Sequence, residues 1–139
     1  MIHIVLLTHA GMGRAFANTL QHIFGTLPAA VEVVEILPDE SPDNGRRRLW
    51  ELIEHLADDD AMLILNDLYG ATPANLIPAI LPEERVAAVS GLNLPMLLRA
   101  LSRREEGLAA ARQGAIDGAV QGVVDILDKR AAPLACSST

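Results

Sequence analysis

Four short apolar runs alternate along this chain with segments in which hydrophobic residues recur at helical spacing. The runs cover about residues 3–8, 31–36, 61–66 and 85–90. Runs of this length between helical patterns are typical of parallel strands joined by right-handed crossover helices. The pattern predicts an α/β fold: an open, mainly parallel sheet of four strands with helices on both faces.

Helix starts are marked by capping residues that are followed by proline. The first helix is predicted over about 13–25, with its final glycine as the stop. The second begins near Ser41 with Pro42 at its first position and runs to about residue 56. Its arginine triplet, residues 46–48, is interpreted as a solvated helical surface.

The same start signal recurs after the third and fourth strands, at Thr72-Pro73 and at Asn93 with Pro95. An alanine-rich helix is then predicted over about 105–117, because its residues favour helix strongly. We expect Gly118 and Gly122 to interrupt it. The valine-rich stretch that follows fits a helix or a strand equally well.

Length and composition indicate one domain over residues 1–130 with a flexible tail, 131–139. The net charge of −7 argues against nucleic acid and against direct attraction to anionic membranes. No apolar run approaches the roughly 18 residues of a membrane span, and no signal peptide is apparent. The single Cys136 lies in the tail, so no internal disulfide is possible and a cytoplasmic location is expected.

Two polar residues stand where apolar runs end in small-residue turns. His9 follows the first run, and Asp67 follows the third. The carboxyl ends of parallel strands carry the chemistry of open α/β sheets, so imidazole and carboxylate are expected to meet across neighbouring strands.

Several kinds of site are excluded by spacing. No His or Cys spacing predicts a metal site, no serine-nucleophile motif occurs, and the lone thiol lies in the tail. The glycines after His9 lack the third glycine of a dinucleotide-binding loop, and no Walker lysine is present. A phosphoaspartate receiver needs an acidic pair after the first strand, where Thr8-His9-Ala10 stands instead.

Histidine itself then remains as the nucleophile, because an ordinary imidazole is largely neutral at pH 7 and offers a lone pair. Asp67 is the candidate to fix its tautomer and to stabilise the charge that develops on the ring. Backbone N–H groups of Gly70 and Ala71, with the Thr72 hydroxyl, are candidates to bind the phosphoryl oxygens. The structural alternatives are that Asp67 only forms a turn and that Thr72 only caps a helix. For Arg14 the alternatives are that it steers phosphate or that it only solvates its helix.

These residues resemble a known family, the IIA component of mannose/sorbose type in the bacterial phosphoenolpyruvate-dependent sugar phosphotransferase system (PTS). The resemblance spans about residues 1–128. Three segments carry it: Thr8-His9, Asp67 to Pro73 with Asn75, and Ser90 to Leu97.

The resemblance implies a phosphocarrier that takes a phosphoryl group on His9 from the phosphohistidine protein HPr and passes it to a IIB component, without cofactor or metal. It also implies a homodimer in which residues near 120–127 form an antiparallel strand on the partner's sheet. Contact with a membrane would be indirect, through a transporter.

The chain departs from the family at two places. Gly70-Ala71-Thr72-Pro73 stands where members often have Gly-Gly-Ser-Pro, and a stand-alone subunit is expected where members are frequently fused to IIB. A regulatory module controlled by phosphorylation is therefore an alternative. The phosphoryl-donor subunit of a dihydroxyacetone kinase is another, because it also places a histidine after its first strand. Residues expected in the site wall or the docking surface are Met12, Arg14, Leu68, Asn93 and Met96.

Overall fold

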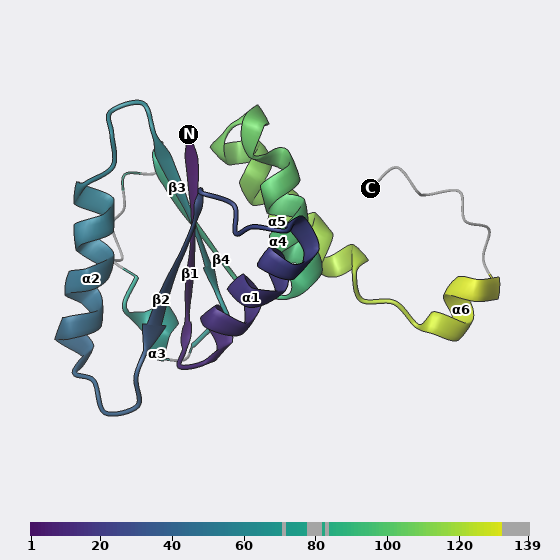
Figure 1. Ribbon diagram of the computed structural model, residues 1–139, viewed down its shortest axis with the longest axis horizontal. Helices are drawn as coiled ribbons and strands as arrows, with labels where there is room; N and C mark the ends of the chain where they lie inside the picture. The colour runs from purple at the N-terminus through teal and green to yellow at the C-terminus, as the bar shows by residue number, and fades with distance from the viewer. Residues whose placement is uncertain (71, 78–81, 83, 132–139) are drawn as a thin grey trace.

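The computed structural model describes residues 1–70, 72–77, 82 and 84–131. Its centre is a parallel sheet of four strands in the order β2-β1-β3-β4 (Figure 1). The strands are β1 (Ile2–His9), β2 (Val31–Ile36), β3 (Ala61–Asn66) and β4 (Val86–Ser90). The predicted open parallel sheet is confirmed.

Helices cover both faces of this sheet (Figure 1). One face carries α1 (Met12–Phe24), α4 (Leu94–Arg103) and α5 (Leu108–Gln121), and the other carries α2 (Pro42–Glu54) and the short α3 (Thr72–Asn75). The central strand β1 is buried on both sides. Ile4 and Leu6 belong to the core under α1, α4 and α5, while Val5 and Leu7 belong to the core under α2 and α3. Burial on both faces explains the unbroken apolar run.

Two predicted helix starts are confirmed by their caps. The Ser41 hydroxyl oxygen accepts a hydrogen bond from the Asn44 N–H at 3.3 Å, and Asn93 Oδ1 accepts one from the Met96 N–H at 2.8 Å. Each of these bonds satisfies an N–H group that has no partner inside the helix.

The start of α1 is capped differently, because Gly11 has no side chain to offer. Thr8 Oγ1 accepts from the Gly13 N–H at 2.8 Å, and the Glu35 carboxylate accepts from the Arg14 N–H at 2.7 Å. A Cβ on Gly13 would lie 2.6 Å from a Val33 methyl carbon. Glycine at this position therefore lets the helix start close against β1 and β2.

The helix predicted over 105–117 begins and ends later in the structure, where α5 covers Leu108–Gln121. A 3-10 turn covers Arg104–Glu106, and Gly107, at φ 107°, separates it from α5. Gly118 does not interrupt α5: a Cβ there would lie 2.6 Å from Arg99 Cβ and 2.7 Å from the Pro95 carbonyl oxygen. This glycine lets α4 and α5 pack closely, and the helix ends just before Gly122.

The arginine triplet of α2 is only partly the solvated surface that was expected. Arg46 and Arg47 are exposed, but Arg48 Nη2 donates to both Glu40 carboxylate oxygens, at 2.9 and 2.8 Å, and to the Glu35 carbonyl oxygen at 2.7 Å. The Leu37 N–H and the Arg48 charge hold the pKa of Glu40 below its usual range, against the opposing effect of burial. Arg48 therefore anchors α2 to the end of β2.

The valine-rich stretch near 120–127 begins within α5, continues through residues without helix or strand, and enters α6 (Ile126–Ala131). In the single chain these residues form no strand. The exchanged strand stays a prediction, because its pairing needs a second chain. The expected tail from 132 onward, with Cys136, lies outside the described residues. Among the described helices, none has the length and apolar content needed to cross a bilayer.

Candidate active site

The candidate site lies between β1 and β3, the two strands from which the chain connects toward opposite edges of the sheet. From β1 the chain passes to β2 on one side, whereas from β3 it passes to β4 on the other side. The carboxyl ends of β1 and β3 therefore border the crevice in which open α/β sheets hold ligands and reacting groups. His9 is the last residue of β1, and Asp67 directly follows β3.

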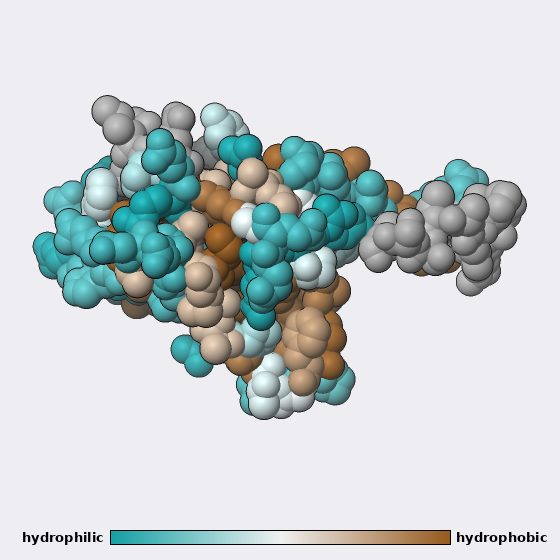
Figure 2. Space-filling view, turned by 90° about the horizontal axis from the view of Figure 1, so that it is seen from above, coloured by the Kyte–Doolittle hydropathy of each residue, from teal (hydrophilic) through white to brown (hydrophobic). Residues whose placement is uncertain are grey.

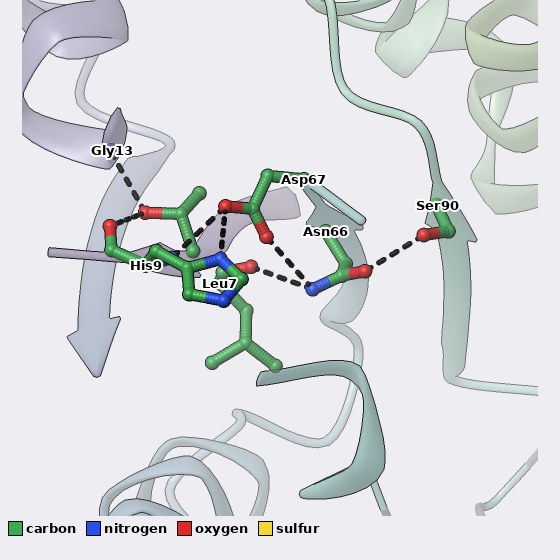
Figure 3. A network of polar contacts seen from close by, with 7 residues as sticks. Leu7, His9, Gly13, Asn66, Asp67 and Ser90 are labelled. Atoms are coloured by element: carbon green, nitrogen blue, oxygen red, sulfur yellow. Dashed lines mark hydrogen bonds and ion pairs between the residues drawn. The ribbon is translucent and has the colours of Figure 1, made fainter. Parts of the chain in front are cut away.

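The structure brings His9 and Asp67 together. His9 Nδ1 lies 2.8 Å from Asp67 Oδ2, and the same oxygen accepts the backbone N–H of His9 at 3.0 Å (Figure 3). The two side chains differ in burial, since the imidazole is 49% exposed and the carboxylate only 6%. A sheltered acid thus holds one edge of a ring whose other edge is open to solvent.

The tautomer of His9 follows from this contact. A carboxylate can only accept a hydrogen bond, so the proton between the two side chains belongs to Nδ1. Nε2 then keeps its lone pair on the outer side of the ring. A ring held in this way by an acid has the geometry that a nucleophilic histidine requires.

The site includes two polar residues that sequence analysis missed. Asn66, at the end of β3, is 1% exposed, and its Nδ2 donates to the Leu7 carbonyl oxygen at 3.1 Å and to Asp67 Oδ1 at 3.4 Å. Ser90, at the end of β4, donates its hydroxyl proton to Asn66 Oδ1 at 2.7 Å. A buried Asn at the end of an apolar run was the available signal, because such a group needs partners.

Thr8 connects the backbone of His9 to α1. Its side chain is fully buried, and its hydroxyl donates to the His9 carbonyl oxygen at 2.8 Å while it accepts from the Gly13 N–H. The backbone around His9 is therefore fixed on the β3 side by Asp67 and on the helix side by Thr8.

The predicted phosphoryl-binding turn is described only in part. Gly70 is exposed and has φ 85°, a conformation that favours glycine. Thr72 begins α3, and Ala71 lies outside the described residues. The roles of Gly70, Ala71 and Thr72 stay predictions.

The residues expected in the wall and docking surface fall into two groups. Met12 and Leu68 are exposed, at 43% and 58%, and flank the His9–Asp67 pair in sequence. Met96 is 1% exposed and belongs to the core under α4, so its prediction as a docking residue is wrong. Apolar spacing on a helix does not distinguish a packed methionine from a surface one.

The two remaining candidates, Arg14 and Asn93, make no hydrogen bond to His9 or Asp67 in the part of the chain that the structure describes. Asn93 caps α4 and donates from Nδ2 to the Ala119 carbonyl oxygen at 3.4 Å, so its polar atoms serve helix packing. Arg14 is exposed and lines, with Glu35 and Arg48, a cavity of about 420 Å³ between α1 and β2.

The fold and the site together define an open α/β protein with a histidine–aspartate pair at the carboxyl ends of its two central strands. The family model of the PTS system fructose IIA component, EIIA-man, matches residues 3–115, and the chain belongs to this family. The resemblance that the sequence motifs indicated is thereby confirmed.

Individual relatives agree with this assignment. The PTS fructose-specific EIIA component of Bacillus subtilis (strain 168) is 26% identical over 106 residues, which cover 76% of this chain and 72% of that protein. The PTS sorbose-specific EIIA component of Lacticaseibacillus casei is 29% identical over 101 residues, 70% of each chain. The crystal structure of the phosphotransferase system component EIIA from Streptococcus agalactiae matches with a TM-score of 0.81 and 26% identity, covering 92% of this chain and 99% of that one.

Proposed function

We propose that this protein is a phosphocarrier in which His9 accepts a phosphoryl group from phospho-HPr and passes it to a IIB component of a sugar transporter. The observation that carries the proposal is the 2.8 Å contact between His9 Nδ1 and the sheltered Asp67 carboxylate. It leaves Nε2 as the available nucleophile on the exposed edge of the ring.

The transfer step exchanges one nitrogen–phosphorus bond for another. The Nε2 lone pair of His9 forms a bond to phosphorus while the bond between phosphorus and the histidine nitrogen of HPr breaks. The departing ring of HPr keeps the electron pair of the broken bond. The proton on His9 Nδ1 stays in place, and Asp67 stabilises the positive charge that the ring acquires. In the transfer to IIB, His9 is the donor: its bond to phosphorus breaks as a histidine nitrogen of IIB forms a new one.

The open setting of the ring supports transfer between proteins. The phosphoryl group is bound to a protein histidine both before and after the transfer. The reaction therefore depends on positioning more than on a large driving force. A half-exposed ring at the carboxyl end of a central strand is accessible to two partners in turn, and exposed Met12 and Leu68, close to His9 and Asp67 in the sequence, offer apolar surface. The chemistry requires no metal or organic cofactor.

The setting of the reaction in the cell forms part of the same proposal. We place the protein in the cytoplasm, where it meets the membrane only through a transporter complex. A homodimer with residues near 120–127 exchanged as strands would shelter exposed side chains such as Val120, Val123 and Leu127. The family match and the sugar-specific relatives favour this role over a purely regulatory module or a dihydroxyacetone kinase subunit.

Labelling tests the proposal. The protein is incubated with labelled phosphoenolpyruvate, enzyme I and HPr, and the expected product carries an acid-labile, base-stable phosphate. His9→Ala should abolish the label. His22→Ala is the matched control, because His22 is exposed on α1, and this variant should be labelled normally. Label that survives in His9→Ala would refute the assignment.

A further inference from the structure

Asn66 lies beneath the candidate site in an orientation that its neighbours fix. The Leu7 carbonyl oxygen can only accept a hydrogen bond, so the amide nitrogen of Asn66 must face it, at 3.1 Å. The amide oxygen then faces β4, where the Ser90 hydroxyl donates to it at 2.7 Å. No flipped orientation of the amide satisfies the Leu7 carbonyl.

This orientation aims the second amide proton at the acid of the site. Asn66 Nδ2 lies 3.4 Å from Asp67 Oδ1, the carboxylate oxygen that does not contact His9 (Figure 3). One oxygen of Asp67 therefore faces the ring and the other faces the buried amide. A continuous chain of hydrogen bonds thus runs from Ser90 at the end of β4, through Asn66 and Asp67 at the end of β3, to the ring of His9.

We infer that Asn66 and Ser90 are positioning residues, which hold the Asp67 carboxylate so that His9 keeps its proton on Nδ1 and presents Nε2. Asp67 follows the last residue of β3, so pairing with the neighbouring strands does not fix the direction of its side chain. A buried carboxylate oxygen that loses its donor is driven to rotate toward solvent. The consequence for phosphoryl transfer rests on the proposed function. The effect of Asn66 and Ser90 on the tautomer of His9 does not depend on it.

The sharpest test compares two variants of nearly equal shape at one position. Ser90→Thr keeps the hydroxyl, whereas Ser90→Val replaces that hydroxyl by a methyl group. The readout is the tautomer ratio of His9, measured from the ¹⁵N chemical shifts of its ring nitrogens at a pH where the ring is neutral. Thr should retain the Nδ1–H form of the wild type. Val should lower the ratio of Nδ1–H to Nε2–H by about threefold to tenfold, the factor expected for one net hydrogen bond.

Asn66→Leu is the second variant, and it should shift the ratio at least as far as Ser90→Val. Backbone ¹H–¹⁵N spectra of each variant establish that the sheet is intact, so a changed ratio is not the result of unfolding. A ratio equal to wild type in both Ser90→Val and Asn66→Leu would overturn the inference. A shift in Asn66→Leu alone would overturn the part assigned to Ser90.

Phosphorylation by phospho-HPr is measured separately on the same variants. Ser90→Val should lower the maximal rate by a similar factor and leave the KM for phospho-HPr unchanged, because the docking surface is untouched. The tautomer measurement uses neither HPr nor phosphate. Failure of wild-type labelling would therefore refute the proposed function while leaving the positioning inference to stand on the ring spectra.

Discussion

The strands β1 and β3 carry a histidine–aspartate pair at each end, and the two pairs differ in ways that bear on function. At the carboxyl ends, His9 Nδ1 meets Asp67 at 2.8 Å. At the amino ends, His3 Nε2 meets Asp60 at 2.9 Å. The chemical groups, the two strands and the separations are nearly the same.

The first difference is which nitrogen each ring offers. His3 uses Nε2 for its aspartate, and its side chain is 21% exposed. His9 uses Nδ1, and its Nε2 has no hydrogen-bond partner among the described residues, on a ring that is 49% exposed. The second difference is the support of the acid. Asp60 is shared with the chain's amino group at 2.8 Å, while Asp67 is held by a buried amide. A His–Asp contact alone therefore does not distinguish His9 from His3. The nitrogen that His9 presents and the buried amide beside Asp67 do.

The largest expected effect separates the two acids. Asp67→Asn should slow phosphorylation by phospho-HPr about a hundredfold, the lower end of what a positioned proton-holding group contributes, because the amide no longer selects the Nδ1–H tautomer. Asp60→Asn is the matched control at the opposite end and should leave the rate within about twofold of wild type. Rates of label incorporation measure both. Equal rates in the two variants would remove Asp67 from the mechanism.

A smaller effect is expected in the reactivity of the two rings toward diethyl pyrocarbonate, which attacks a neutral imidazole nitrogen. His9 should be modified several times faster than His3, because its Nε2 is free and its ring is more exposed. Mass spectrometry of peptides after timed modification gives both rates from one sample. Faster modification of His3 would contradict the assignment of the free nitrogen.

The smallest effect concerns acid stability at the amino ends. Hydrogen bonds from the chain's amino group and from His3 hold the pKa of Asp60 below its usual range. The stability that this carboxylate contributes is present above its ordinary pKa of about 3.9, and it is lost as the pH falls through the lowered value. Asp60→Asn should therefore show a shallower fall of the unfolding midpoint below about pH 4. A fall as steep as in the wild type would contradict the role of this pair.

The features that could be predicted from the sequence are those that depend on local pattern. The strands can be predicted from apolar runs. A strand that is covered on both faces has no solvent-facing polar positions, so its sequence is almost continuously hydrophobic. Ser41 and Asn93 mark helix starts, since their side chains satisfy backbone groups of the following turn. His9 and Asp67 stand out because each directly ends such a run.

Long-range packing explains what could not be predicted. Gly118 suggested a helix break, but its missing side chain is required where α5 crosses Arg99 and Pro95. Met96 has the same apolar character as Met12 and lies on the covered side of its helix. Asn66 and Ser90 lie far apart in the sequence, and only the pairing of β3 with β4 places one opposite the other.

The opposite routes that the chain takes after β1 and β3 have a consequence for access to the ring. Because the two connections leave toward opposite edges of the sheet, the topology itself leaves a crevice between the ends of these strands. Under the proposed function, partner proteins would meet the ring at this crevice, and the rate of phosphorylation should rise with the concentration of phospho-HPr.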